Sequence, residues 1–135
     1  MDSTAEREPK RFRPAMHVRS GKHFRRAYSQ GSRAGGDLMT VAVVANELAH
    51  TRLGLSVGKR VWKGAVRRNR VRRIFREAFR LEYAELPEGY DLILIGSRPR
   101  IRPSLADTRR ELVRLAHKAR RRYLEKLAAR EEQGA

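Results

Sequence analysis

The sequence predicts a single-domain α+β sandwich, an αβ fold with the element order α-β-β-α-β-α. Three observations lead to this fold class. The chain has 135 residues, which is long enough for one domain and too short for two. Apolar residues make up 40% of it, enough to form a core. Helix-like and strand-like apolar patterns follow one another along the chain, as in proteins whose helices pack on a sheet.

The folded domain is expected to span residues 16–128. A flexible basic N-terminal tail over 1–15 precedes it, and a frayed C-terminus over 129–135 follows it. The first helix begins after Ser20, a typical N-cap, and ends at Gly31, a typical stop signal.

Three segments have the composition of strands. Residues 38–45 are rich in β-branched side chains and predict a buried strand. Residues 52–58 are expected to pair with it as the second strand of a hairpin. The sequence leaves room for one more short strand before residue 38. Residues 91–95 are the most apolar segment and should lie in the interior of the sheet.

A final helix is predicted after Ser104, another typical N-cap. Its apolar residues recur at spacings of three and four, as one buried helix face requires. They are Leu112, Leu115, Ala116, Ala119, Tyr123 and Leu127.

The most informative segment is residues 67–80, which hold seven arginines in fourteen residues with Glu77 as the only acid. Its apolar residues keep the spacing of an amphipathic helix, and the regular helix is expected to begin around 67–69. A helix with this density of like charge needs an anionic partner. Nucleic acid is the polyanion that best meets this need.

The composition of the whole chain agrees with this interpretation. Lys and Arg number 32 against 15 Asp and Glu, which gives a net charge of +17 and a pI near 11.5. Such a charge is typical of nucleic-acid-binding domains. The chain contains no cysteine, which excludes disulfides and thiolate metal sites. Its apolar runs are of strand length, so we expect a cytoplasmic protein with no membrane partner.

The chain contains two ordered motifs. The first is the segment 54–61, which reads Gly-Leu-Ser-Val-Gly-Lys-Arg-Val. The second is Arg68-Asn69-Arg70, followed by Arg72-Arg73 and Arg76-Glu77. Together they resemble the motifs of the bacterial ribonuclease P protein subunit, and the second is the hallmark of that family. The resemblance covers roughly residues 17–124.

The resemblance implies a fold, a partner and a set of binding residues. The fold would contain a left-handed βαβ crossover. The partners would be the ribonuclease P RNA subunit and precursor tRNA, whose 5′ leader is removed; no DNA partner is expected. The RNA-subunit-binding residues would be Arg68, Asn69, Arg70, Arg72, Arg73 and Arg76. The residues of a leader-binding cleft would be Phe24, Tyr28, Lys59 and Arg60.

The chemistry implied by the resemblance belongs to the RNA. The RNA subunit would bind most of the Mg²⁺, no protein side chain would be catalytic, and no organic cofactor would be needed. Whether the protein itself binds a metal ion stays open. Residues 54–58 match a Gly-x-Ser-x-Gly motif, but a strand pattern surrounds Ser56, which excludes the nucleophile elbow of a hydrolase.

Several alternatives stay open at the level of sequence. Asn69 suits either an RNA contact or a helix N-cap. Phe24 and Tyr28 have the spacing of core residues as well as of a stacking surface. The role of Trp62 is undetermined, and His17 stands where the family usually has a basic residue. The competing functions are a structural RNA-binding protein of ribosomal type and an architectural DNA-binding protein.

Overall fold

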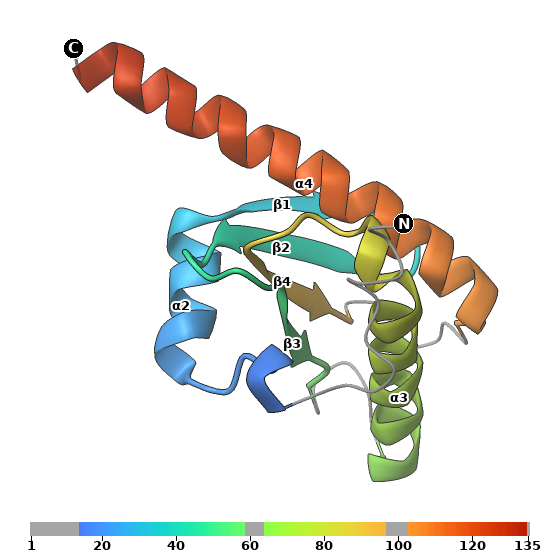
Figure 1. The fold of residues 1–135 in the computed structure, drawn as a ribbon. Coiled ribbons are helices and arrows are strands. Elements are labelled where there is room, and N and C mark those ends of the chain that lie inside the picture. Colours follow the sequence, from blue (N-terminus) through green and yellow to red (C-terminus); the bar gives the residue numbers. More distant parts are fainter. Residues whose placement is uncertain (1–13, 59–63, 97–102, 135) are drawn as a thin grey trace, which may run out of the picture.

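The computed structural model describes residues 14–58, 64–96 and 103–134. Within them, four strands form one mixed sheet in the order β1-β2-β4-β3, and three α-helices pack around it (Figure 1). The α+β fold class is therefore confirmed. The elements are η1 (Pro14–Met16), α2 (Gly21–Gln30), β1 (Ser32–Gly35), β2 (Thr40–Ala45), β3 (Arg52–Ser56), α3 (Ala65–Glu82), η2 (Tyr83–Glu85), β4 (Tyr90–Ile95) and α4 (Leu105–Gly134).

The strand pairing corrects one prediction and confirms another. The short strand expected before residue 38 exists as β1, and it forms an antiparallel hairpin with β2. The predicted hairpin between residues 38–45 and 52–58 is wrong, because β3 pairs in parallel with β4. The apolar strand β4 lies between β2 and β3 and is hydrogen-bonded on both edges. The most apolar strand gains the most from this central position, since both its faces and both its edges are covered.

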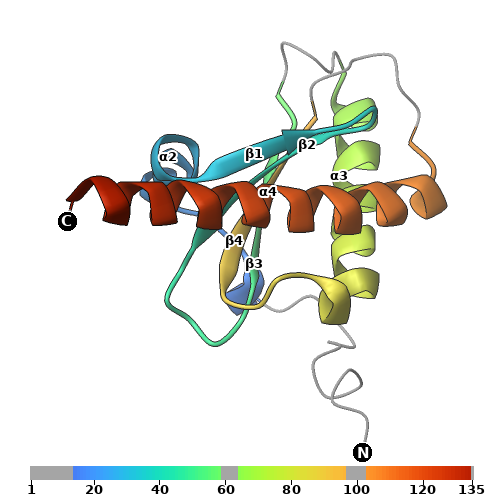
Figure 2. The same ribbon diagram turned by 90° about the horizontal axis from the view of Figure 1, so that it is seen from above.

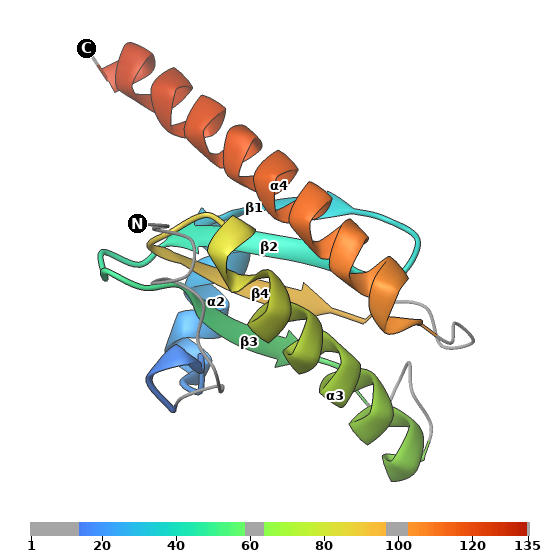
Figure 3. The same ribbon diagram turned by 45° about the vertical axis from the view of Figure 1, so that its right-hand side comes forward.

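The two faces of the sheet carry different helices. Figure 3 shows α3 and α4 in front of the sheet and α2 behind it. On the front face, the ring of Tyr90 from β4 meets that of Tyr123 from α4, with centroids 5.9 Å apart. On the rear face, Phe24 from α2 lies over Gly54 of β3, where an added Cβ would come within 3.0 Å of the phenylalanine ring.

The connection from β3 through α3 to β4 is a crossover between parallel neighbours. In Figure 3 both strands run toward the right and α3 returns in front of them, so the path from β3 to β4 is left-handed. Almost all crossovers of this kind are right-handed. The resemblance to the ribonuclease P protein subunit implied this unusual hand.

The arginine-rich helix is confirmed, with an earlier start than predicted. Its buried residues are Val71, Phe75, Ala78 and Phe79. The helix begins at Ala65 rather than around 67–69. The predicted start assumed that Val66 could not lie on the polar side, but Val66 is 76% exposed. The first turn makes no buried contact of its own, so the apolar pattern does not mark its boundary.

The last helix follows its predicted pattern and then continues. The Ser104 hydroxyl accepts a hydrogen bond from the backbone N–H of Asp107 at 3.1 Å, as an N-cap does. The predicted stripe is buried from Leu112 to Tyr123. Residues 129–134, which were expected to fray, are helical in the structure. Alanine, arginine, glutamate and glutamine are strong helix formers, and this end of α4 projects beyond the sheet (Figure 2).

The start of the domain is tied to the edge of the sheet. Residues 1–13 of the predicted tail lie outside the described residues. Met16 and Val18 are buried, and the N–H of Val18 donates to the carbonyl of Leu53 at 2.8 Å. The first helix then follows its predicted N-cap, because the Ser20 hydroxyl accepts from the N–H of Lys22.

Candidate nucleic-acid interface

The outer side of α3 presents most of the residues predicted to bind RNA. Asn69, Arg70, Arg73 and Arg76 are exposed, and Arg68 and Arg72 are half-buried. The acid of this segment, Glu77, accepts hydrogen bonds from Arg80 at 2.5 and 3.1 Å. This contact lowers the pKa of Glu77 and pairs its negative charge with Arg80. The remaining arginines of the segment therefore form a surface with a strong positive potential.

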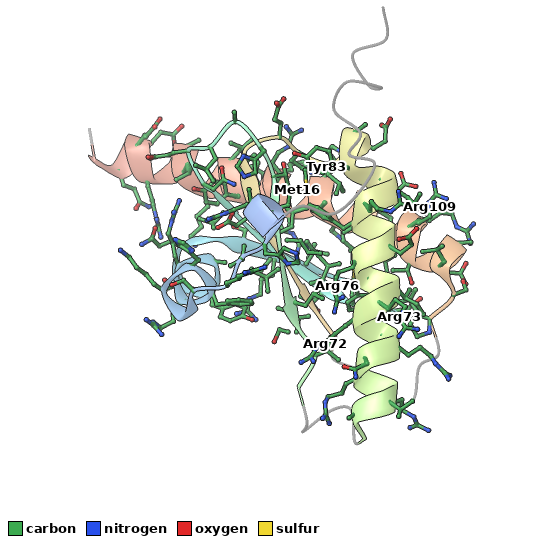
Figure 4. The ribbon with its side chains drawn as sticks, turned by 60° about the horizontal axis from the view of Figure 1, so that its bottom comes forward. Met16, Arg72, Arg73, Arg76, Tyr83 and Arg109 are labelled. Carbon is green, nitrogen blue, oxygen red and sulfur yellow. The ribbon has the colours of Figure 1, made fainter. Side chains whose placement is uncertain are left out.

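The arginines of α3 point in more than one direction. Figure 4 shows Arg72 and Arg76 on the flank of α3 that faces β3, and Arg73 on the other side. One guanidinium N–H of Arg72 donates to the carbonyl of Val57 at 3.3 Å, which holds this side chain beside the end of β3. A nucleic acid lying along α3 would meet a wide band of cations rather than a single row.

Asn69 is not a helix N-cap. The cap position of α3 is Gly64, at a φ of 90°, and it makes no side-chain cap hydrogen bond. Glycine suits this position because it adopts positive φ without strain. Asn69 lies in the second turn with its side chain exposed. Of the two alternatives for Asn69, the N-cap is therefore wrong, and the RNA contact stays a prediction.

His17 joins this surface, although the sequence singled it out only as a departure from the family pattern. It forms a parallel bridge with Leu53, so its side chain lies on the α3 side of the sheet. Burial, together with the positive charges of Arg19 and Arg76, lowers the pKa of its imidazole. Near neutral pH the imidazole of the folded protein is therefore neutral, and a bound phosphate would favour its protonation.

The other predicted binding surface lies on the opposite face of the sheet. Phe24 is half-buried against the core, whereas Tyr28 is 36% exposed, and their ring centroids are 6.4 Å apart. Of the two alternatives that the sequence left open, core packing applies to Phe24 and surface exposure to Tyr28. Phe24 packs on the sheet and is partly accessible, and Tyr28 belongs to the surface.

Two arginines that the sequence did not single out lie on the same face of the sheet as these rings. The guanidinium of Arg33, from β1, lies 4.8 Å from the centre of the Tyr28 ring. Arg52, from β3, makes two hydrogen bonds of 2.7 Å to the buried carboxylate of Asp91. Both occupy the α2 face of the sheet by register. Only the strand pairing could have placed them there, since no local motif contains them.

Some predicted site residues lie outside the described residues. Lys59 and Arg60 of the predicted leader cleft are among them, and so is Trp62. Among the residues that the structure does describe, no group of three or more His, Asp or Glu side chains could hold a metal ion. In the same part of the chain, no helix has the length and apolar character needed to cross a bilayer.

The chain is similar to known proteins along most of its length. The family model described as Ribonuclease P matches residues 12–120. The ribonuclease P protein component of Syntrophobacter fumaroxidans is 42% identical over 89 residues, which cover 66% of this chain and 74% of that one. That of Clostridium botulinum is 34% identical over 103 residues, which cover 76% and 92%.

Solved structures show the same similarity in three dimensions. The RNase P protein of Staphylococcus aureus has a TM-score of 0.67 with 27% identity, covering 77% of this chain and 94% of that one. The RNase P protein from Thermotoga maritima has a TM-score of 0.67 with 25% identity, covering 76% and 96%. The matches therefore leave a larger share of this chain uncovered than of the solved chains.

Proposed function

The chain belongs to the ribonuclease P protein family, and we propose that it binds the catalytic RNA of that enzyme through the outer side of α3. Ribonuclease P protein components are part of an endoribonuclease that processes tRNA. The observation that carries the proposal is the charge of α3, which holds seven arginines and two acids, and both acids are paired, Glu77 with Arg80 and Glu82 with Arg109. Family membership also argues against the ribosomal-type alternative.

Guanidinium groups suit this role because their fork of N–H donors binds phosphate oxygens in pairs. The six family positions are Arg68, Asn69, Arg70, Arg72, Arg73 and Arg76. If they engage about six phosphates, the logarithm of the binding constant should fall with the logarithm of salt concentration with a slope of about −4. Neutralising and positioning the RNA, rather than side-chain chemistry, is the contribution that these residues can make.

We propose further that the α2 face holds the 5′ leader of precursor tRNA. Single-stranded nucleotides bind through base stacking on aromatic rings and cations beside the backbone, largely without sequence preference. Tyr28 offers an exposed ring, and Arg33 supplies a cation at its face. Phe24 extends the apolar surface onto Gly54.

The chemical step would belong to the RNA subunit and its Mg²⁺. RNA phosphates would hold the ions, and the protein would place the scissile bond of the precursor beside them through its two RNA contacts.

Reconstitution tests this proposal. Purified protein is mixed with ribonuclease P RNA and precursor tRNA at low Mg²⁺, and removal of the leader is measured. The Arg70→Ala variant should weaken RNA-subunit binding and make the salt slope less negative by about 0.7 to 0.9. The control is Arg130→Ala, which removes one exposed helical charge at the projecting end of α4.

Two outcomes would contradict the proposal. One is failure of the wild-type protein to stimulate leader removal with its RNA subunit. The other is equal weakening by Arg70→Ala and Arg130→Ala, which would mean that the RNA responds only to net charge. Competition with duplex DNA covers the architectural alternative, since equal affinity for DNA and for the RNA subunit would favour that function.

A further inference from the structure

The corner between α2 and β1 carries an aromatic ring and a cation of the rear face. α2 ends at Gln30, and β1 begins at Ser32. Tyr28 lies in the last turn of α2 with an exposed ring, and Arg33 is the second residue of β1. The guanidinium of Arg33 lies 4.8 Å from the centre of that ring. The geometry of this pair therefore depends on two elements that meet at one turn of the chain.

The inner side of this corner rests on the sheet. The N–H of Gly31 donates to the carbonyl of Ala27 at 3.1 Å, and a Cβ added at Gly31 would lie 2.2 Å from the carbonyl oxygen of Val43. In the described sheet β1 is an edge strand, and its neighbour is β2. With ten residues, α2 is too short for helix propensity alone to hold its last turn. The outer side of the corner needs support from another element.

Lys126 of α4 supplies a cation to the C-terminus of α2. Its ammonium donates to the carbonyl of Gly31 at 3.1 Å and lies 3.5 Å from the carbonyl of Gln30. α2 itself has Lys22 in its first turn and no basic residue in its last turn, which is the reverse of what a helix dipole favours. The last carbonyls of a helix lack partners within it, so a cation from another element stabilises this end.

Arg122 of α4 holds the other side of the corner. One of its guanidinium N–H groups donates to the carbonyl of Arg33 at 2.8 Å. Arg122 and Lys126 are four residues apart, so both side chains leave the same side of α4. Between them, the buried ring of Tyr123 packs edge-on against Tyr90 of β4, which fixes the rotation of α4 at this level. In Figure 2 the C-terminal part of α4 lies beside α2 and β1.

We call Arg122 and Lys126 the α4 clamp. Both residues lie beyond the family match, which ends at residue 120, whereas Tyr28 and Arg33 lie within it. α4 continues as a helix to Gly134. The charges on this side of its last part therefore have partners within the fold, and those partners belong to the corner.

A ring and a cation that are already ordered bind a nucleotide more tightly than mobile ones. Side chains in the last turn of a helix and on an edge strand lose conformational freedom when a base stacks on them. The cost of this ordering is subtracted from the free energy of binding. Contacts that order the corner in the free protein remove part of the cost before RNA binds.

We propose that Arg122 and Lys126 are positioning residues for the 5′ leader of precursor tRNA, because they hold the corner that carries Tyr28 and Arg33. The inference rests on the proposed function, since the leader must bind at Tyr28. The α4 clamp itself makes no contact with the RNA. Its effect on precursor tRNA therefore passes through the ring and the cation of the corner.

The test uses the double substitution Arg122→Met and Lys126→Met in the full chain. Methionine keeps the length and helix propensity of these side chains and removes both their charges and their donors. Affinity is measured for precursor and mature tRNA on the assembled holoenzyme, and for the RNA subunit alone. The affinity for precursor tRNA should fall by about three- to tenfold, and the other two should stay within about twofold of the wild type.

The same double substitution in the Tyr28→Ala background separates positioning from direct contact. Residues that act through one ring have non-additive effects. Once the ring is absent, the double substitution should lower precursor affinity by less than about twofold. A loss in that background as large as in the wild-type background would mean that Arg122 and Lys126 contact the RNA directly, and the inference would be wrong.

Amide hydrogen exchange in the free protein reports on the corner without RNA. The N–H of Gly31 should exchange at least about fivefold faster in the double methionine variant, while the amides of β4 keep their wild-type rates. Unchanged exchange at Gly31 would show that the α4 clamp does not hold the corner. Faster exchange with unchanged precursor affinity would show that the contacts serve stability alone. Either result would overturn the inference.

Two matched variants control for donors and for net charge. The exchange Arg122→Lys with Lys126→Arg keeps both charges and an N–H donor at each position, and it should keep precursor affinity within about twofold of the wild type. Arg121→Met with Arg130→Met removes two exposed charges from the same helix and should have an equally small effect. A loss in either control as large as in the double methionine variant would contradict a role for the carbonyl contacts.

The outcomes also separate this inference from the proposed function. If Tyr28→Ala leaves the preference for precursor over mature tRNA unchanged, the leader surface is wrong, and the positioning role of the α4 clamp is wrong with it. If Tyr28→Ala lowers that preference and the double methionine variant does not, only the α4 clamp is wrong. The contact of α3 with the RNA subunit is tested separately, by Arg70→Ala.

Discussion

The two faces of the sheet differ in the helices that cover them. The front face packs against α3 and α4, and the residues there include the fully buried Phe75, Phe79, Leu112 and Leu115. The rear face packs against the ten-residue helix α2, which contributes the buried Ala27 and the half-buried Phe24. Ser56 and Ile95, on the same face by register, are also half-exposed.

This difference separates stability from recognition. A face covered by two helices gains free energy from every buried methylene, and the helices can place their charges outward. A partly covered face gives up some of that free energy and keeps aromatic and cationic groups within reach of a ligand. Substitutions on the front face should therefore change mainly the free energy of unfolding. Substitutions on the rear face should change mainly the affinity for RNA.

The largest expected effect is on the front face. Phe75→Ala removes a ring with no exposed surface and should lower the free energy of unfolding by about 3 to 5 kcal/mol. Phe24→Ala is the matched control, and it should cost about half as much because Phe24 is half-buried. Denaturant unfolding measures both. Equal losses would mean that the rear face is as much a core as the front.

A smaller effect is expected on the rear face. Tyr28→Ala should remove about 1 to 3 kcal/mol of stacking free energy and so reduce affinity for precursor tRNA relative to mature tRNA. Its unfolding free energy should hardly change, because Tyr28 is exposed. Tyr28→Phe keeps the ring and should retain the preference for precursor. Equal loss of affinity for both RNAs in Tyr28→Ala would remove Tyr28 from the leader surface.

The smallest effect concerns the edge where α3 meets the start of the domain. The pKa of His17 is lowered in the folded state from its ordinary value of 6.5, so the unfolded chain takes up the proton first as pH falls. Stability should therefore decrease as pH falls through about 6.5, and the shift should have no effect well above it. His17→Gln should lose this part of the pH dependence, while the other acid-sensitive groups stay unchanged.

Thermal unfolding at pH 7.5 and pH 5.5 measures this difference. The wild-type protein should lose more stability over that interval than His17→Gln. With RNA bound, the order should reverse, because a nearby phosphate favours the protonated imidazole. An identical pH response of the two proteins would show that neither burial nor the charges of Arg19 and Arg76 lower the pKa of His17 in the folded state.

Local features of the fold were accessible from the sequence. The N-caps at Ser20 and Ser104 are correct, since a cap involves only a side chain and a backbone N–H two or three residues away. The buried stripe of α3 is correct for the same reason, because helical spacing is set by the chain itself. The candidate RNA-binding residues of α3 came from the resemblance to the family, and the stripe leaves them outside the core.

Non-local features were not accessible in this way. The pairing of residues 52–56 with β4 rather than with β2 could not be read from either segment, because any strand can offer the same backbone donors and acceptors. The positions of Arg33, Arg52 and His17 depend on that pairing. The different exposure of Phe24 and Tyr28 depends on where α2 crosses the rear face.

The sequence by itself determined the excess of positive charge, the amphipathic helices and the ordered arginine motif that marks the family, because each of these depends on residues a few positions apart. Only the tertiary structure decided which side chains share a surface. That outcome depends on the order of the strands, and the order is set by burying the apolar strand β4 between two partners that lie far from it in the chain.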